Sequence, residues 1–314
     1  MNKKDLKIHI IGAGVSGLIA ARVLENHGFS PVIIEATDRV GGRVKTDLIG
    51  GYRLDHGFQV LLTAYPAAQK YLDYKALELQ KFLPGASIFL NNGQKLIGDP
   101  LRSPSLLFST LFSGIGTLSD KIRILKLNLY LKKKSLTTIF AENEQTTHSY
   151  LTNLGFSEEI ITNFFKPFFS GIFLETKLET SSRMFEFVYK MFGEGHATLP
   201  KSGIEAIPKQ LLENLKTTTL KYNTKVETLK ETEITLKDGT CLKSDYTIIA
   251  TEASELVSNL KNQSTEWKSC VTLYFETDAR VITKKLIGLI SKPGTLVNNI
   301  FYNSSLDARI KPAN

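Results

Sequence analysis

Residues 10–46 read IIGAGVSGLIAARVLENHGFSPVIIEATDRVGGRVKT, and this stretch decides the fold of the chain. Its first three glycines follow a short apolar run at 7–11 and precede a stretch at 15–27 with leucine and alanine at helical spacing. A second apolar run follows at 31–36. A strand, a helix and a strand in about thirty residues predict a βαβ unit with parallel strands.

Each glycine of the turn has a physical role. Gly12 permits the sharp bend, Gly14 lets the backbone approach a pyrophosphate, and Gly17 lets the helix pack close to the strand. The first N–H groups of the helix, including those of Val15 and Ser16, have no partner within it, and the helix dipole favours an anion there. Because the turn follows a strand and opens a helix, it predicts a dinucleotide site.

The acid that ends the second strand and the glycines behind it extend this pattern. A carboxylate at Glu35 accepts hydrogen bonds from a ribose 2′-hydroxyl and repels a 2′-phosphate. In the run DRVGGR that follows, Gly41 and Gly42 bring backbone near a cofactor while Arg43 supplies positive charge. Taken alone, the run is also compatible with a glycine turn that carries a surface arginine. With the preceding turn and acid in place, cofactor contact is the favoured interpretation.

Residues 10–46 resemble the opening of the flavin amine oxidase superfamily, which includes monoamine oxidases, protoporphyrinogen oxidases and carotenoid desaturases. The resemblance continues at 54–59, 225–227 and 245–251, and at 200–211, where Ser202 and Ile204 replace a usual glycine and methionine. It implies FAD as the cofactor. The residues that it implies as FAD contacts are Gly12, Gly14, Val15, Ser16, Gly17, Glu35, Ala36, Gly41, Gly42, Arg43, Gly57, Phe58, Gln59, Val226 and Thr251.

The expected fold is α/β, with a Rossmann-like FAD-binding domain interleaved with a mixed α+β substrate domain. The FAD-binding domain takes residues 1–75 plus 195–260, and the substrate domain takes 76–194 plus 261–314. The family's closing segment, a Gly-Asp pair before a helix of small residues, has no counterpart in the sequence. We therefore expect a C-terminally truncated chain whose substrate domain lacks on the order of a hundred residues.

The middle of the chain predicts mostly helices, at 65–80, at 100–136 and at 149–190, with breaks near Pro167 and Gly171. Two apolar pieces within 83–98 flank Asn-Asn-Gly and predict a hairpin. After residue 198 come a helix at 204–215 and then short strands. The last of these is a strand expected at 269–277.

No catalytic residue can be assigned, because flavin enzymes leave the electron chemistry to the cofactor. Among the histidines only His56 lies near the flavin by resemblance. Lys268 is close to a position where some related amine oxidases place a lysine, but a one-residue shift in register moves it to the other face, and a solvated lysine is the favoured interpretation.

The region around 164–191 is rich in aromatic and apolar residues. Core packing explains most of them, and by resemblance some line an apolar pocket, which favours a hydrophobic small-molecule substrate. The cluster consists of Phe164, Phe165, Phe168, Phe169 and Phe173.

Composition narrows the partners. The net charge of +8 is too diffuse to indicate nucleic acid. Cys241 and Cys270 have no disulfide or metal-ligand spacing, so we expect no metal site and a cytoplasmic location. No apolar run reaches the length of a membrane span. The basic stretch at 121–134 predicts a solvated helix face or, alternatively, peripheral contact with a membrane.

The leading functional hypothesis is an FAD-dependent oxidoreductase that removes a hydride from a C–N or C–C bond, similar to an amine oxidase or desaturase. One alternative is an NAD-dependent dehydrogenase, because the glycine turn with an acid also serves NAD. The other is a truncated, non-catalytic flavoprotein relative. The sequence names neither the substrate nor the electron acceptor.

Overall fold

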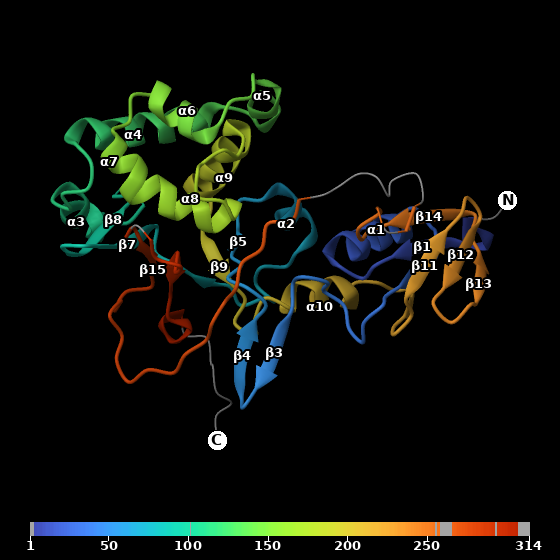
Figure 1. The fold of residues 1–314 in the computed structure, drawn as a ribbon. Coiled ribbons are helices and arrows are strands. Elements are labelled where there is room, and N and C mark those ends of the chain that lie inside the picture. Colours follow the sequence, from blue (N-terminus) through green and yellow to red (C-terminus); the bar gives the residue numbers. More distant parts are fainter. Residues whose placement is uncertain (1–2, 101, 255, 258–265, 293, 307–314) are drawn as a thin grey trace.

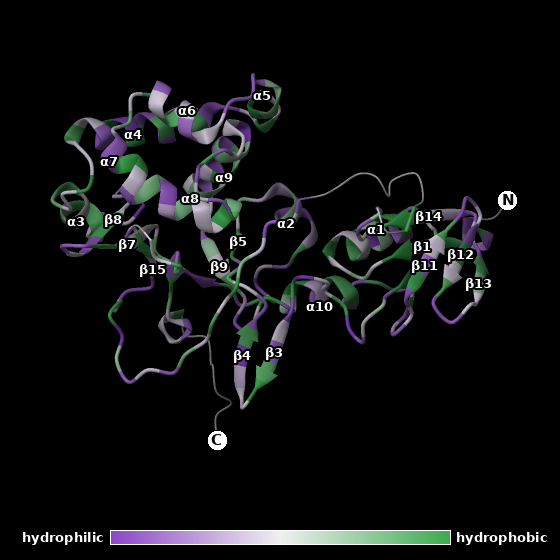
Figure 2. Cartoon of the chain, viewed as in Figure 1, coloured by the Kyte–Doolittle hydropathy of each residue, from purple (hydrophilic) through white to green (hydrophobic). Residues whose placement is uncertain are grey.

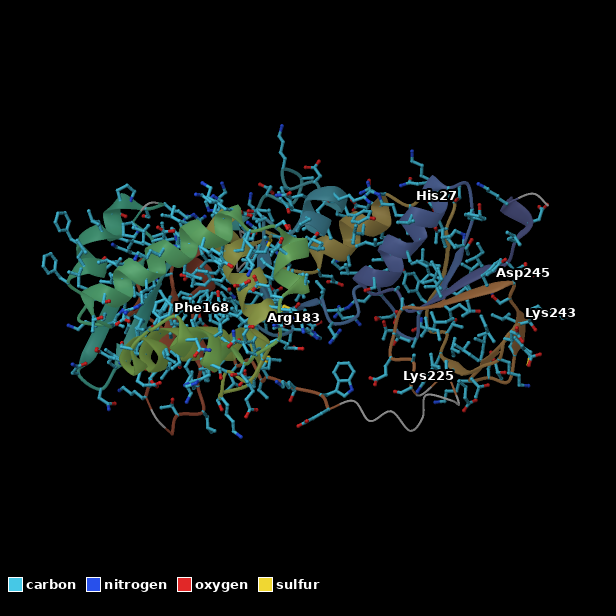
Figure 3. All side chains as sticks on the ribbon, turned by 90° about the horizontal axis from the view of Figure 1, so that it is seen from above. His27, Phe168, Arg183, Lys225, Lys243 and Asp245 are labelled. Carbon is cyan, nitrogen blue, oxygen red and sulfur yellow. The ribbon has the colours of Figure 1, made fainter. Side chains whose placement is uncertain are left out.

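The computed structural model describes residues 3–100, 102–254, 256–257, 266–292 and 294–306. These residues form an elongated molecule with two ends of different character (Figure 1). One end, here called the sheet lobe, carries a parallel sheet. The other end, called the helical lobe, carries most of the helices above a mixed sheet, and Figure 3 shows the same two-ended shape from above.

The parallel sheet of the sheet lobe has the order β10 (Thr219–Lys221), β2 (Val32–Ile34), β1 (Ile8–Ile11) and β14 (Tyr246–Ile249). Helix α1 (Val15–Asn26) connects β1 to β2. All four residues of β1 are buried, as expected for a central parallel strand. The predicted βαβ unit and α/β fold class are therefore confirmed.

A second sheet packs against the first. Its antiparallel strands are β11 (Val226–Leu229), β12 (Glu233–Leu236) and β13 (Cys241–Lys243). Ile11 and Ile34 from the parallel sheet form one apolar cluster with buried side chains of this second sheet. This packing holds the two sheets together.

The helical lobe is built around α4 (Leu118–Lys133), α8 (Lys166–Phe173) and α9 (Ser182–Glu194). Phe165 and Phe169 are fully buried among them. The remaining helical segments of this lobe are η2 (Pro104–Leu106), α3 (Leu107–Leu111), α5 (Leu136–Ala141), α6 (Thr147–Asn153), α7 (Glu158–Ile160) and the π-helical turn η3 (Ile161–Phe165).

A mixed sheet underlies these helices, in the order β16 (Asn299–Ile300), β15 (Ile287–Ile290), β7 (Gly85–Leu90) and β8 (Gly93–Gly98). Strands β7 and β8 form the predicted hairpin. Strand β15 brings the late part of the chain back beside β7 in parallel register. The domain boundaries at 75, 195 and 260 stay predictions.

Short elements occupy the middle of the molecule. Figure 1 shows the β3–β4 hairpin projecting from it and α10 running toward the sheet lobe. These elements are β3 (Thr46–Ile49), β4 (Tyr52–Asp55), β5 (Leu61–Leu62), α2 (Pro66–Tyr71), β6 (Gln80–Lys81), β9 (Ala197–Leu199) and α10 (Ala206–Glu213). The 3-10 turns η1 (Lys3–Asp5) and η5 (Asn303–Leu306) lie toward the two ends of the described chain.

One helix prediction was wrong and another was right only in part. The helix expected at 65–80 is limited to α2, because Leu72 adopts an extended conformation and residues 80–81 pair with β9. Directly before Pro167 the π-helical turn η3 meets α8, and the Lys166 N–H donates to the Ile161 carbonyl, so regular α-helical hydrogen bonding is interrupted there. No break occurs at Gly171, because α8 continues to Phe173 and ends at Leu174, with φ 53°.

The strand expected at 269–277 was also wrong. The segment does alternate apolar residues, but no strand forms there among the described residues. Side-chain hydrogen bonds tie it to β4 instead, including one of 2.8 Å from the Tyr274 hydroxyl to the Asp55 carbonyl. Because Lys268 stands outside any strand, the argument from register does not apply to it.

Candidate cofactor site and apolar cavity

The glycine turn follows the carboxyl end of β1, where Gly12 has φ +100°. A Cβ on Gly12 would lie 3.2 Å from the Ala250 carbonyl oxygen, and one on Gly17 would lie 2.0 Å from the Gly12 carbonyl oxygen. A Cβ on Gly14 would meet no atom within 4 Å. A side chain would therefore clash with backbone at Gly12 and Gly17, whereas the space beside Gly14 is empty.

The open space lies at a terminus that can receive an anion. Gly14 is the N-cap of α1, no side chain caps the helix, and its first turn holds no acid. Strand β1 lies between β2 and β14, so the chain order reverses at this edge of the sheet. Ligands of open α/β sheets bind at such a crevice. Thr251, which follows β14, lies beside the turn, with its Cβ 3.4 Å from the position of a Cβ on Gly12.

The second glycine loop crosses the first. The Gly41 N–H donates to the Ala13 carbonyl at 2.9 Å, and Gly14 forms an isolated parallel bridge with Gly41. A Cβ on Gly42 would lie 3.4 Å from the Gly14 Cα. The structure therefore brings together Gly14, Gly41 and Gly42, and their contact with a cofactor stays a prediction. The exposed Arg43 guanidinium lies 5.6 Å from the centre of the Trp267 ring.

The Glu35 carboxylate accepts hydrogen bonds from the first glycine turn and from the start of the segment that leads to the second. One carboxylate oxygen accepts the Ala13 N–H at 2.7 Å, and the other accepts the N–H and the hydroxyl of Thr37, each at 2.8 Å. A carboxylate offers about four acceptor sites. Three protein hydrogen bonds therefore leave capacity for a ligand hydroxyl, while the adjacent Ala36 is exposed.

The predicted segment 57–59 joins the cofactor loops to the helical lobe. Gly57 has φ +83°, and the Gln59 amide donates to the Arg43 carbonyl at 3.0 Å. The Phe58 ring lies 6.2 Å from the Phe82 ring in an edge-on arrangement. Phe82 in turn lines a cavity in the helical lobe. This is the physical connection between the glycine loops and the cavity.

Val226 and Ser202, in two later segments of the resemblance, differ in their exposure. The Val226 side chain is buried and packs with Ile11 and Ile34, so only the backbone of Val226 is available to a ligand. Ser202 is exposed, whereas Gly203 has φ +94° and a Cβ there would lie 2.5 Å from the Thr46 hydroxyl oxygen. The chain thus keeps glycine at the position of this segment that requires it.

A polar network near the β3–β4 hairpin was not predicted from the sequence. Arg39 forms ion pairs with Asp47 at 2.5 Å and with the buried Glu205 at 3.4 Å, and Asp47 accepts from His56 at 2.7 Å. The hydrogen bond from Arg39 holds the pKa of Asp47 below its usual range. His56 therefore has a structural partner, and a direct role for it stays a prediction. The only sequence signal was the charge of Arg39 within DRVGGR.

Asp55 links the hairpin to the start of α10. Its carboxylate accepts from the Thr46 hydroxyl at 2.6 Å and from the Ile204 N–H at 3.0 Å. Burial raises the pKa of Asp55, while the two hydrogen bonds oppose that rise. This link places residues 203–206 against the β3–β4 hairpin.

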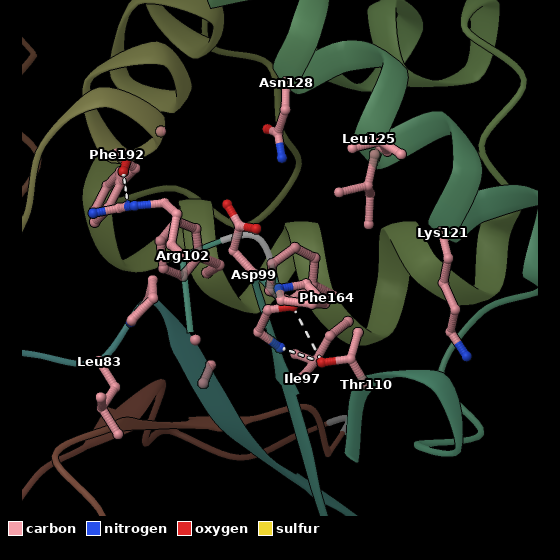
Figure 4. Close-up of a pocket in the computed structure, with 18 of the residues that line it drawn as sticks. Leu83, Ile97, Asp99, Arg102, Thr110, Lys121, Leu125, Asn128, Phe164 and Phe192 are labelled. Atoms are coloured by element: carbon pink, nitrogen blue, oxygen red, sulfur yellow. Dashed lines mark hydrogen bonds between the residues drawn. The ribbon is translucent and has the colours of Figure 1, made fainter. Parts of the chain in front are cut away.

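The helical lobe contains an apolar cavity of about 410 Å³ (Figure 4). Phe164 and Phe168 of the predicted aromatic cluster line it, whereas Phe165 and Phe169 belong to the core. Residues of β7 and β8 line it together with residues of α3 and α4. A volume of this size suits a small organic molecule.

Polar groups gather where this cavity meets a second one of about 230 Å³. Asp99, Arg102 and Asn128 line both, and Figure 4 shows them on one side of the larger cavity. Arg102 donates to the carbonyls of Phe192 and Gly195, each at 2.5 Å, so it caps the end of α9. Burial lowers the pKa of Arg102. Nothing in the local sequence indicated this role.

The described part of the chain offers neither a metal-ligand cluster nor a membrane-spanning helix. Residues 3–100, 102–254, 256–257, 266–292 and 294–306 contain no group of three or more His, Cys, Asp or Glu side chains placed to hold a metal ion. Within the same ranges, no helix has both the length and the apolar character to span a bilayer.

A parallel sheet with crossed glycine loops, joined to a lobe that holds an apolar cavity, defines an α/β protein of the dinucleotide-binding class. The chain belongs to the family of flavin-containing amine oxidoreductases, which matches residues 15–309. The family confirms the resemblance seen in the sequence and the expectation of a flavin cofactor. No comparison supports the NAD alternative.

Three similar proteins show how far the likeness extends. Protoporphyrinogen oxidase 2 of Arabidopsis thaliana is 27% identical over 168 residues, covering 52% of this chain and 32% of that protein. An L-amino-acid oxidase of Sistrurus catenatus edwardsii is 35% identical over 104 residues, covering 32% of this chain and 20% of the relative. A solved structure of a Pyrococcus furiosus protein superposes with a TM-score of 0.63 at 14% identity, covering 96% of this chain and 76% of that one.

The chain spans a third or less of the length of the two curated relatives. At 14% identity the solved structure shows the fold alone.

Proposed function

We propose that this chain provides the FAD-binding turn and the substrate cavity of an FAD-dependent oxidoreductase that removes a hydride from a C–N or C–C bond. The observation that carries the proposal is the empty space beside Gly14, which lies between two glycines where a side chain would clash with backbone. Phe58 and Phe82 connect this turn to the cavity. FAD, when bound, supplies the acceptor for the hydride.

The residues present fit the cofactor. The α1 N-terminus and the space at Gly14 suit the pyrophosphate, and the remaining acceptor capacity of Glu35 suits a ribose hydroxyl. Thr251 and segment 57–59 complete the proposed contacts on either side. The chain's own groups thus bind and orient the cofactor.

The cavity lining favours a hydrophobic substrate with at least one polar group. Most of the lining is aliphatic or aromatic, including Phe164, Phe168 and Leu125. The Asn128 amide faces the cavity in Figure 4 and is placed to bind a polar atom of the ligand. A cytoplasmic location remains a prediction.

Absorption spectroscopy tests the cofactor. The purified 314-residue chain is incubated with FAD and passed through gel filtration, with an NAD incubation as the matched control. We expect the bands of oxidised flavin to elute with the protein. A chain that folds but elutes without flavin would contradict the proposal that these residues suffice.

The cavity is tested separately with Nile red, a neutral apolar fluorophore. Gly193 of α9 lines both cavities, and a Cβ there would meet no atom within 4 Å. We expect Gly193→Leu to weaken Nile red binding several-fold by filling this space. Gly193→Ala is the control, and it should keep the affinity while stabilising α9 by about 1 kcal/mol. Equal binding by both variants would place the ligand elsewhere.

A further inference from the structure

Helix α4 presents an apolar stripe to solvent. Leu118, Ile122, Leu125 and Leu129 are 66%, 48%, 41% and 51% exposed. Their spacing of four, three and four residues places them on one face of the helix. A surface helix normally turns such a face to the core, and in α4 the core contacts are made by another stripe that includes the buried Leu127.

Helix α3 extends this face. Phe108 and Phe112, four residues apart, are 72% and 79% exposed, and Leu111 is also exposed. Leu111 lines the cavity, as do Leu118, Ile122 and Leu125 of the α4 stripe. The apolar face therefore surrounds the outer side of the cavity. We call the residues Leu107, Phe108, Leu111, Phe112, Leu118, Ile122, Leu125 and Leu129 the α3–α4 face.

The charged residues of the segment that carries this face are almost all basic. Between residues 102 and 141 the sequence holds a single acid, Asp120. That acid is buried and accepts hydrogen bonds from Thr117 and Ser157. Lys126 and Lys133 are exposed and follow Ile122 and Leu129 by one turn, so they border the stripe along one side.

The structure narrows the basic stretch that the sequence indicates at 121–134. Lys134 is buried and forms ion pairs with Glu142 at 2.6 Å and Glu186 at 2.5 Å. Arg123 lies against Gly155 and bonds to Ser119. These two cations are therefore directed to protein partners, and the exposed cations stand beside the apolar stripe.

We propose that the α3–α4 face docks on an anionic lipid surface and that the cavity takes its apolar substrate from that surface. An apolar centre with a cationic margin suits the boundary between acyl chains and anionic headgroups. A second copy docked face to face would bring Lys126 and Lys133 toward cations of the same kind, which is unfavourable. The docking rests on the exposed face alone, and the delivery of substrate rests also on the proposed function.

Vesicle sedimentation tests the docking. The full chain is mixed with phosphatidylcholine vesicles with and without phosphatidylserine, at low and physiological salt. We expect binding to the anionic vesicles that weakens with salt. Lys126→Gln/Lys133→Gln should lower the partition coefficient about thirty-fold, because each lysine near such a surface contributes about 1 kcal/mol. The matched control is Lys237→Gln/Lys243→Gln, two exposed lysines of the sheet lobe, where Figure 3 labels Lys243.

The apolar contribution has its own pair of variants. Phe108→Ser/Phe112→Ser should abolish binding without unfolding, because both side chains are exposed. The control Leu48→Ser/Ile49→Ser removes two exposed apolar residues from β3 and should bind like wild type. Figure 2 shows the hydrophobic residues of β3 at the tip of the central hairpin, away from α3 and α4.

Each remaining outcome has a meaning. Absence of binding to anionic vesicles, or equal loss in test and control variants, would overturn the proposal. A dimer in gel filtration that Phe108→Ser/Phe112→Ser converts to a monomer would assign the face to a second copy instead. Vesicle binding without flavin retention would leave the docking intact and reject the proposed function, and the reverse result would do the opposite.

Discussion

Two alanine substitutions in the glycine turn should have opposite consequences. At Gly17 an added Cβ would lie 2.0 Å from the Gly12 carbonyl oxygen, about an ångström inside the closest contact that real Cβ atoms make. The obstacle is backbone, so α1 must move away from β1. Overpacking of this kind costs about 3 kcal/mol, and the better helix propensity of alanine returns about 1 kcal/mol. Gly17→Ala should therefore lose about 2 kcal/mol of stability.

At Gly14 the same change should leave stability almost intact. Its φ of −68° and ψ of 175° suit alanine, and the new Cβ meets no atom within 4 Å. The weaker N-cap and the smaller entropy of the unfolded chain offset each other to within about 1 kcal/mol. The Cβ would however fill the space proposed for the pyrophosphate. We expect the Kd for FAD to rise at least about tenfold, which removes about 1.4 kcal/mol of binding free energy.

Thermal unfolding with and without FAD separates the two effects. Gly17→Ala should lower the melting temperature of the flavin-free protein by about 3 °C, because the unfolding entropy of a chain of this length is large. Gly14→Ala should match wild type without FAD but gain less from added FAD. A Gly14→Ala protein that FAD stabilises as strongly as wild type would refute the pyrophosphate assignment. A Gly17→Ala protein with an unchanged melting temperature would refute the packing argument.

Three further substitutions test the supporting structure. Glu35→Ala should destabilise the protein by about 2 kcal/mol in urea unfolding, because the buried Ala13 N–H loses its acceptor, and Glu35→Gln should cost less. Lys134→Met should cost about 3–5 kcal/mol by leaving the Glu186 carboxylate buried and unpaired, and adding Glu186→Leu should restore part of that loss. Burial tends to raise the pKa of Asp120, but hydrogen bonds from Ser157 and Thr117 outweigh it and hold the pKa below 3.8. The carboxylate therefore stabilises the fold above that pH and less as the pH falls through the folded pKa, so urea unfolding should show the deficit of Asp120→Asn shrinking below about pH 4.

Local patterns carried the prediction of the cofactor loops. Gly12, Gly14 and Gly17 lie within six consecutive residues, and their spacing specifies a turn, an open position and a close helix contact that depend on little else. The acid at Glu35 and the glycines at 41 and 42 follow within one βαβ unit. Short-range backbone geometry of this kind can be read directly, because each constraint acts on neighbouring residues.

The strand expected at 269–277 shows where local reading fails. Val271, Leu273 and Phe275 alternate as a half-buried strand would, yet all three are exposed. A strand exists only where neighbouring backbone completes its ladder, and among the described residues none pairs with this segment. The alternation of apolar residues is present, but it does not specify a neighbouring strand for the segment to pair with.

The sequence by itself determined the cofactor class, the parallel βαβ opening and the apolar character of the helical region. Only the tertiary structure decided the cavity, the placement of Arg102 and Asn128 on its polar side, and which residues of the basic stretch face solvent. The physical reason is distance along the chain. The cavity wall combines Phe82, Leu125 and Phe164 with residues as late as Ile287, and nothing in the local sequence specifies that these four meet.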